Sequence, residues 1–228
     1  MGTVGVLGGM GAMATAVFNT MLVNAQTVEK EQDYLDVITY SKTSIPDRTT
    51  FILGQSIVDP TPDIVAAAKT LEQAGVDFIA IPCVTVHYFY DAIANAVNIP
   101  VINILEEIAE HVQIQDIKSL GVLATDGTLQ TGILHNVFEP LNINLLILEP
   151  NEQATLMEMI YHIKEGQEIL QEDFERLEDI LFAKGAEVIL LGCTELGFIK
   201  SDRIEKRVDV LDILVQAVLK TMSNGYSQ

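Results

Sequence analysis

An internal repeat constrains this chain more than any other feature of its sequence. The stretch from Leu71 to Cys83 (LEQAGVDFIAIPC) aligns without a gap with the stretch from Leu181 to Cys193 (LFAKGAEVILLGC), 110 residues later (193 − 83). Each copy reads as a short helix that ends at a glycine, followed by a run of apolar residues that breaks at a cysteine. Such runs, preceded by a helix and bounded by turn residues, are typical of buried parallel strands.

A second pair of segments repeats in the same order. GVLGGMGAMAT, which begins at Gly5, resembles GVLATDGTLQT, which begins at Gly121, and the shared Gly11 and Gly127 lie 116 residues apart (127 − 11). Two ordered markers at nearly equal offsets indicate a duplicated unit. We therefore predict an α/β fold of two similar lobes, each a parallel sheet flanked by helices, related by pseudo-twofold symmetry with the site in the cleft between them.

The boundary between the predicted lobes has no linker rich in Pro, Gly or Ser. We expect the seam near residues 97 to 100. The first lobe is predicted to comprise residues 1–98 and 209–228, so that the last helix packs back on it, and the second lobe to comprise residues 99–208. Each lobe then carries one of the two cysteines. Further strands are expected at residues 3–9, 36–42, 98–104 and 143–150 from their apolar content.

Length, charge and cysteine content narrow the class of protein. A chain of 228 residues with 49% hydrophobic and 20% charged residues builds a sizeable core. Its net charge of −19, with 13 Lys and Arg scattered along the chain, argues against binding nucleic acid. No apolar run approaches the roughly 20 residues that span a membrane, and the N-terminus does not resemble a signal peptide. We therefore expect a cytoplasmic protein with reduced thiols that acts on a small molecule.

The glycine-rich turn at residues 8–11 allows three interpretations. It superficially resembles a dinucleotide-binding loop, but the G-x-G-x-x-G order is absent. It could be a tight turn without a ligand. The interpretation that we favour is a loop that brings backbone N–H groups and the N-terminus of the following helix to an anionic group.

The two cysteines also allow several interpretations. They could be inert packing residues, a redox pair, or metal ligands, although no C-x-x-C is present and the four histidines (His87, His111, His135 and His162) are dispersed without ligand spacing. The functional interpretation is acid–base chemistry on two faces of one carbon, in which one residue acts as thiolate and the other as thiol. This symmetry suits racemisation or epimerisation, and an ordinary thiol pKa of about 8.5 lies near working pH.

The whole chain resembles the cofactor-independent aspartate/glutamate racemase family, and most closely its aspartate racemase branch. The resemblance is carried by GGMGAMAT, IPDRT (45–49), IPCVT around Cys83, ATDGT (124–128), IKEG around Lys164, GCTEL around Cys193, and VDVLD. It implies two α/β lobes, a homodimer, no pyridoxal phosphate and no metal. It also implies that Cys83 and Cys193 are the catalytic residues, with Cys193 deprotonating the L enantiomer and Cys83 the D enantiomer.

The resemblance implies a set of substrate-binding residues as well. Arg48 and Lys164 match positions that bind the side-chain carboxylate of a dicarboxylic amino acid, where a guanidinium can bind in bidentate fashion. Met10, Thr85 and Thr194 match positions that hold the α-carboxylate and the amino group. The substrate is thus expected to be an acidic amino acid, aspartate above all.

One position departs from the family pattern. Val84 stands where the family usually has asparagine after the first cysteine, and valine cannot offer a side-chain amide to the substrate. Loss of one such hydrogen bond weakens binding by roughly 0.5–1.5 kcal/mol. Two alternatives therefore stay open beside an aspartate racemase: a racemase of broader or different specificity, and a relative that binds a dicarboxylate with little or no turnover.

Overall fold

Two separate parallel sheets organise the chain. The computed structural model describes residues 2–225 of the 228-residue sequence, and within them seven strands are assigned. The first sheet has the order β2-β1-β3 and the second the order β5-β4-β6-β7, and every pairing in both sheets is parallel. Their bounds are β1 Thr3–Gly8, β2 Asp36–Ser41, β3 Phe78–Ala80, β4 Ser119–Leu123, β5 Asn144–Leu146, β6 Val188–Leu191 and β7 Arg207–Asp209. The predicted α/β fold with two parallel sheets is confirmed.

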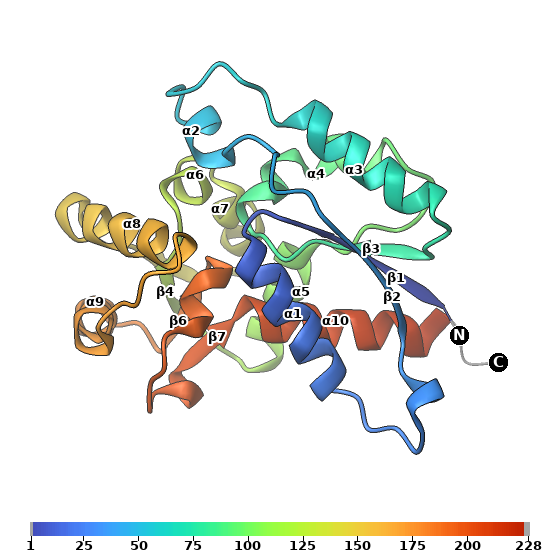
Figure 1. The fold of residues 1–228 in the computed structure, drawn as a ribbon. Coiled ribbons are helices and arrows are strands. Elements are labelled where there is room, and N and C mark those ends of the chain that lie inside the picture. Colours follow the sequence, from blue (N-terminus) through green and yellow to red (C-terminus); the bar gives the residue numbers. More distant parts are fainter. Residues whose placement is uncertain (1, 226–228) are drawn as a thin grey trace.

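Helices flank both sheets and connect the parallel strands (Figure 1). The α-helices are α1 Ala12–Asn24, α2 Arg48–Ile52, α3 Thr61–Gln73, α4 Tyr90–Ala94, α5 Ile104–Ile114, α6 Asp126–Gln130, α7 Ile133–Phe138, α8 Pro150–Lys164, α9 Gln171–Ala183 and α10 Val210–Gly225. Short 3₁₀ helices are η1 Glu31–Asp33, η2 Thr85–Phe89, η3 Glu139–Leu141, η4 Thr194–Phe198 and η5 Ile204–Lys206. Helix α10 follows β7 of the second sheet and contacts α5 and α1, so it ties the two halves together. No helix within residues 2–225 has the length and hydrophobicity needed to cross a membrane.

The sequence repeat is a repeat of backbone geometry. Gly75 and Gly185 follow α3 and α9 in the left-handed region, with φ of +88° and +103°. In both copies the next residue donates its N–H to the carbonyl of the aligned leucine, Leu71 or Leu181. This is the bond of a Schellman helix end, in which glycine takes the left-handed conformation without a side-chain penalty. The same chain reversal therefore leads into β3 and into β6.

The hydrophobic core joins the two halves. One cluster of buried residues packs around β3 and α3, and another around β6, α8 and α9. The largest cluster contains Phe18 of the first half together with Ile108 of α5, Leu120 of β4 and Leu214 of α10. Burial of apolar surface stabilises a fold by about 25 cal/mol per Å². A core that crosses the seam therefore holds the two sheets in a fixed relation and positions the loops that meet between them.

The strand expected at residues 98–104 is wrong in extent. Only a single parallel bridge forms there, between Ile79 and Val101. The N–H of Ile79 donates to the carbonyl of Pro100 and the N–H of Ile102 donates to the carbonyl of Ile79, each at 2.9 Å. Proline has no N–H with which to extend the ladder, and α5 begins at Ile104, so the pairing stops after one residue.

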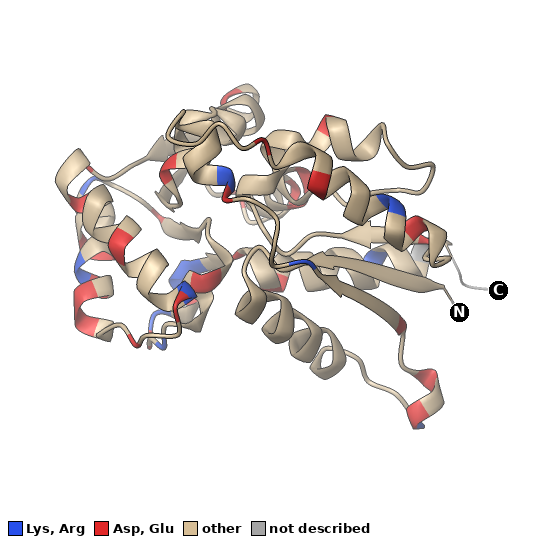
Figure 2. Ribbon diagram, turned by 45° about the horizontal axis from the view of Figure 1, so that its top comes forward, with Lys and Arg blue, Asp and Glu red and all other residues tan. Residues whose placement is uncertain are grey.

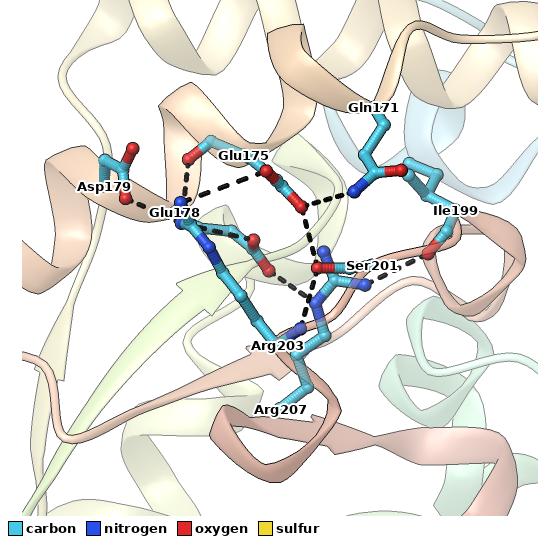
Figure 3. A network of polar contacts seen from close by, with 8 residues as sticks. All are labelled: Gln171, Glu175, Glu178, Asp179, Ile199, Ser201, Arg203 and Arg207. Carbon is cyan, nitrogen blue, oxygen red and sulfur yellow. Dashed lines mark hydrogen bonds and ion pairs between the residues drawn. The ribbon is translucent and has the colours of Figure 1, made fainter.

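A buried ion pair holds the chain between η4 and β7 against α9 (Figure 3). The Glu178 carboxylate in α9 is fully buried, and Nε of Arg207 donates to its Oε1 at 2.6 Å. Nη1 of Arg207 also donates to the carbonyl of Ile199, and Arg203 donates to Asp179 nearer the surface. This network fixes the segment that follows η4. The helix η4 itself carries two residues of the candidate site, Thr194 and Glu195.

Replacing Glu178 with alanine is expected to lower the free energy of unfolding by about 3–5 kcal/mol, because the change leaves the Arg207 guanidinium buried without its carboxylate. Urea denaturation monitored by circular dichroism measures the change. Asp33→Ala is the matched control, since it breaks an exposed pair with Lys30 that is worth at most about 1 kcal/mol. Equal effects of the two substitutions would contradict the role assigned to Glu178.

Candidate active site

The two cysteines occupy equivalent places at the carboxyl ends of the two sheets. Cys83 lies between β3 and η2, and Cys193 lies between β6 and η4. Both thiols are free, and the residues are only 7% and 6% exposed. The carboxyl ends of parallel strands are where open α/β sheets bind their ligands. The repeat therefore brings one thiol to this edge from each half of the chain.

Lys164, the last residue of α8, lies among charged groups from both halves. Burial favours the neutral amine and lowers the pKa of Lys164, and Arg48 acts in the same direction. Cys193 and Cys83 in their thiolate forms, together with Glu195, act in the opposite direction, and the pKa is raised overall. Because Coulomb interactions weaken with distance, the influence of both cysteines on this pKa indicates that they lie near the same ammonium group.

Arg48 is a buried cation without an anionic partner. It begins α2, is 7% exposed, and forms no ion pair with any residue in the described part of the chain. Its Nη1 donates to the carbonyls of Ile45 and Pro46, and its Nη2 donates to the carbonyl of Met10 at 3.1 Å. A guanidinium has five donors, so Nε–H and one N–H of Nη2 are left over, and Nε is buried without a hydrogen-bond partner. The group is thus held in place by backbone carbonyls while two neighbouring donors remain free.

Glu195 reaches from the second half of the chain to the N-terminus of α1 in the first half. A Cβ added to Gly11, the residue that caps α1, would lie 2.5 Å from Oε1 of Glu195. A larger residue at position 11 would therefore displace the Glu195 carboxylate from this place. The loop at residues 8–11 was expected to bring backbone N–H groups to an anion; Oε1 of the protein's own Glu195 lies beside Gly11 but is buried without a hydrogen-bond partner, so no N–H of the loop donates to it.

Glu195 also contacts the second cysteine. The Cys193 thiol donates to Oε2 of Glu195 at 3.1 Å, and the Thr194 hydroxyl donates to the same oxygen at 3.0 Å. Burial raises the pKa of Cys193 well above its usual value, the Glu195 charge raises it further, and Lys164 lowers it. The Cys193 sulfur is therefore a protonated thiol when Glu195 is ionised.

Three threonine hydroxyls meet between the two halves, next to Cys83. Thr85 in η2, Thr125 before α6 and Thr128 in α6 form a triangle with oxygen–oxygen distances of 3.0, 2.9 and 3.0 Å. All three residues are buried. Thr85 was expected to bind substrate, and its hydroxyl here contacts the other half of the chain, so ligand binding at Thr85 would rearrange this triangle.

Val84 and Met10 were expected to bind substrate, and the side chains of both are buried in the core. The Val84 side chain is 2% exposed and belongs to the large core cluster, and Met10 is 2% exposed in the cluster around β3. The carbonyl of Met10 already accepts from Arg48. The bulk of both side chains is thus used in packing.

His87 in η2 holds the backbone of Cys83. It is 4% exposed, its Nδ1 lies 2.9 Å from the Cys83 carbonyl oxygen, and the backbone N–H of Ile104 donates to its Nε2 at 3.2 Å. Because Nε2 accepts, Nδ1 carries the proton of the neutral ring and donates it to Cys83. Burial lowers the pKa of His87 to about 4, which keeps the ring neutral at physiological pH.

The lowered pKa of His87 predicts a pH dependence of stability. Between an unfolded value of 6.5 and a folded value of about 4, the unfolded chain binds a proton that the folded chain does not. The free energy of unfolding contributed by His87 is thus present above pH 6.5 and lost as the pH falls, by roughly 2–3 kcal/mol between pH 7 and pH 4.5.

The measurement is urea denaturation of the wild type, of His87→Asn and of His135→Asn at both pH values. His135 is exposed, so its variant should follow the wild type, whereas His87→Asn should lose less stability on acidification. A His87→Asn variant with the wild-type pH dependence would refute the assignment.

Two residues of this site were missed by sequence reasoning. Glu195 stands in GCTEL, beside residues that were selected, and the signal for it was an acidic residue directly after a buried cysteine and a threonine. His87 was considered only as a metal ligand, and its spacing of four residues from Cys83 was the overlooked signal. Within residues 2–225 no group of three or more His, Cys, Asp or Glu is arranged to hold a metal ion.

Comparison with known proteins identifies the family of this chain. The sequence profile of the Asp/Glu/Hydantoin racemase family matches residues 7–220, and the chain belongs to that family. It is 27% identical over 221 residues to the broad specificity amino-acid racemase RacX of Bacillus subtilis, covering 92% of each chain.

Solved structures share the fold. The aspartate racemase of Picrophilus torridus superposes with a TM-score of 0.88 at 26% identity, covering 98% of this chain and 95% of that one. The glutamate racemase of Francisella tularensis, solved with D-glutamate, superposes with a TM-score of 0.71 at 20% identity, covering 97% and 81%. The two-lobe racemase fold is thus established for this chain, as is its membership of a family of isomerases.

Proposed function

We propose that this protein racemises an acidic amino acid, L- and D-aspartate above all, by a two-base thiol mechanism without pyridoxal phosphate. The observation that carries the proposal is the Arg48 guanidinium, which is buried without an anion yet has two donors left over. An unpaired buried charge is costly, so a fold that keeps one is adapted to an anion from outside the chain. The chain has a net charge of −19, which repels a dicarboxylate, so such a substrate needs positive charge placed locally at its site.

Lys164 supplies the second positive charge for the side-chain carboxylate. Its ammonium group forms no ion pair within the described residues and lies 5.7 Å from the centre of the Tyr161 ring. Arg48 would bind the carboxylate through Nε–H and Nη2–H, and Lys164 would add a point charge. A lysine near both cysteines also couples recognition of the side chain to the place where the α-carbon would react.

Cys83 and Cys193 would perform the proton transfers. The thiolate of one takes the α-proton, the electron pair of the C–H bond passes to the α-carboxylate as an enediolate, and the thiol of the other returns a proton to the opposite face. The two sulfurs exchange protonation states in each turnover. We assign abstraction from the L enantiomer to Cys193, with Lys164 favouring its thiolate and Glu195 opposing it, and abstraction from the D enantiomer to Cys83.

The α-carboxylate and amino group would lie against Met10, Thr85 and Thr194, together with the backbone N–H of Val84. Donors aimed at the carboxylate stabilise the charge that develops there when the α-proton leaves. The Thr85 hydroxyl can turn from its threonine neighbours to the ligand, because Thr125 and Thr128 then still bond each other.

The experiment that tests the function is proton exchange in deuterated water. Each enantiomer of aspartate and glutamate is incubated separately with the protein, and deuterium at the α-carbon and the appearance of the opposite enantiomer are followed by NMR and chiral chromatography. Racemisation of aspartate with deuterium in the product supports the proposal. Absence of both signals for all four compounds would refute it.

Val84 favours a second candidate, a racemase of broader specificity. Its side chain is packed in the core and cannot supply the amide that the family usually has at this place, and one relative of this chain is a broad-specificity racemase. A panel of acidic and neutral amino acids separates this candidate from an aspartate racemase. Tight binding of a dicarboxylate without α-proton exchange would instead identify a binding protein with little turnover.

The proposed setting follows from the same features. Two reduced thiols suit the cytoplasm, where disulfides are rare.

We propose that residues 1–98 with 209–228 form one lobe and residues 99–208 the other. The division of strands β1 to β3 and β4 to β7 between the two sheets supports two lobes, with Val101 reaching across to pair with Ile79 of the first sheet and β7 ending at Asp209.

A homodimer is proposed through the face that α1 and β2 form. Helix α1 has no charged residue, edge strand β2 has only Asp36, and Thr39 of β2 donates to Asn19 of α1. Figure 2 shows this face almost without charged residues. An uncovered edge strand with a single charged residue invites pairing with another chain. In a chain of net charge −19, a second copy meets the least repulsion at this face.

Val37→Lys is expected to convert the dimer into a monomer, because Val37 is an exposed residue of β2 and the lysines of two copies would repel each other. Sedimentation velocity measures the mass. Ile57→Lys is the matched control, since Ile57 is 97% exposed in the loop before α3. A monomeric wild type, or a Val37→Lys variant that stays dimeric, would contradict this interface.

A further inference from the structure

The backbone of Cys83 is fixed on both sides by bonds that the repeat does not require. Its N–H donates to the carbonyl of Ile81 at 2.8 Å, and its carbonyl accepts from Nδ1–H of His87. The second copy of the repeat has Gly197 at the position of His87, counted from the cysteine, so the Cys193 carbonyl has no such side-chain donor and accepts from the backbone N–H of Leu196 at 3.0 Å instead. The two cysteines therefore differ in whether a side chain four residues later can bond their carbonyl.

His87 is itself immobilised by its surroundings. The backbone N–H of Ile104, which begins α5, donates to Nε2, and the ring stacks on Tyr90 with centroids 6.0 Å apart and planes 9° from parallel. The Tyr90 hydroxyl donates to the carbonyl of Val101. One neutral ring therefore bridges the loop that carries Cys83 and the N-terminus of α5, the helix that packs against α10 and α7 at the seam.

The orientation of the Cys83 carbonyl has a direct consequence for the next peptide N–H. In a trans peptide the C=O and N–H point in opposite directions. With the Cys83 carbonyl directed to His87, the N–H of Val84 faces away from His87, free to donate to a ligand. The position of the Cys83 Cα and the direction of its side chain follow from the same restraint.

We infer that His87 is a positioning residue for Cys83: as the neutral Nδ1–H tautomer it ties the Cys83 carbonyl to the start of α5, and so fixes the thiol and the following N–H relative to the substrate. This inference rests on the proposed function for the role of Cys83 in catalysis. The restraint on the thiol itself is a property of the protein without substrate, and it can be measured without any assay of activity.

Two substitutions separate the two hydrogen bonds of the ring. In His87→Asn the side-chain amide nitrogen takes the place of Nδ1 and can donate to the Cys83 carbonyl, while the bond from Ile104 is lost. In His87→Gln the side-chain carbonyl takes the place of Nε2 and can accept from Ile104, while the bond to Cys83 is lost. The pair therefore removes one bond at a time with polar side chains of similar size.

The experiment compares alkylation of the two thiols by iodoacetamide at pH 8, quantified by mass spectrometry of the two cysteine peptides. In His87→Gln the Cys83 thiol is expected to react at least about fivefold faster than in the wild type, because a freed loop exposes a thiol that is now buried, while Cys193 keeps its rate. In His87→Asn both rates should stay within about twofold of wild type. His135→Gln, at an exposed position, serves as the control.

Activity provides the second readout. His87→Gln should lower kcat for racemisation at least about tenfold and more than His87→Asn does, with no new ionisation in the pH profile between pH 6 and 8. Equal alkylation of Cys83 in the wild type and His87→Gln, or a joint increase for both thiols, would overturn the inference. A selective change at Cys83 in a protein that racemises no acidic amino acid would uphold the restraint and refute the proposed function instead.

Discussion

Cys83→Ala and Cys193→Ala variants are each expected to fold and to lose racemisation in both directions, by about a thousandfold or more, because general acid–base groups contribute typically 10²–10⁴-fold each. Either direction needs one sulfur as base and the other as acid, so removal of one sulfur stops both. Chiral chromatography of aspartate started from each enantiomer measures the loss. Circular dichroism checks the fold, and thiol titration should count one thiol in each variant against two in the wild type.

The single variants also separate the two proposed roles. With Cys83 absent, Cys193 can still take the α-proton of L-aspartate and return a solvent-derived one to the same face. Deuterium should then enter L-aspartate without formation of D-aspartate, and the Cys193→Ala variant should do the same with D-aspartate. Exchange with the enantiomers interchanged would reverse the assignment of the bases. Unchanged racemisation in both variants would eliminate the two-thiol mechanism.

The groups around Cys193 determine how readily its thiol loses the proton. Burial and the Glu195 charge raise the pKa of this thiol, so at rest it holds a proton that it donates to Oε2 of Glu195. The nearby Lys164 opposes this effect. A substrate carboxylate bound to Lys164 would weaken that opposition, and the balance between Glu195 and Lys164 therefore sets how readily Cys193 becomes a thiolate.

The two-lobe architecture could be predicted because the sequence contains an internal repeat. The alignment of Leu71–Cys83 with Leu181–Cys193 appears in the structure as two helix ends with left-handed glycines, each followed by a parallel strand: β3 at the end of the first sheet and β6 inside the second. The strand at residues 98–104 was overestimated, because an apolar run next to Pro100 was given more weight than the missing N–H of proline. The apolar pattern of the sequence thus identified this strand, and the missing backbone N–H of proline limited its length.

The candidate site was only partly predictable. Cys83, Cys193, Arg48 and Lys164 could be named from motifs, because each is a chemically distinctive residue in a distinctive context. The Glu195 contact with the N-terminus of α1 depends on how the two halves pack, and the sequence gives no distance between Gly11 and Glu195. His87 was hidden for a different reason, since its partners are backbone groups, which every residue has.

Arg48→Met is expected to lower kcat/KM for aspartate roughly a hundredfold, which corresponds to a loss of about 3 kcal/mol in transition-state stabilisation. The reason is that the substrate loses charge-assisted hydrogen bonds worth about 1.5–3 kcal/mol each. Asparagine and aspartate have nearly the same shape but differ in side-chain charge. The variant should therefore lose much less against asparagine, or another neutral amino acid that the wild type accepts, than against aspartate. Kinetics with both substrates at fixed ionic strength give the ratio.

The same measurement tests a purely structural role for Arg48. Its guanidinium donates to the carbonyls of Ile45, Pro46 and Met10, so it also connects the loop before α2 to the loop before α1. If this were its only role, Arg48→Met would reduce activity toward charged and neutral amino acids by the same factor. Lys164→Met is the matched comparison, because Lys164 makes no such backbone bonds in the described structure and its loss should change only the preference for the charged substrate. Parallel selectivity changes in both variants would show that two cations from the two halves of the chain recognise one carboxylate.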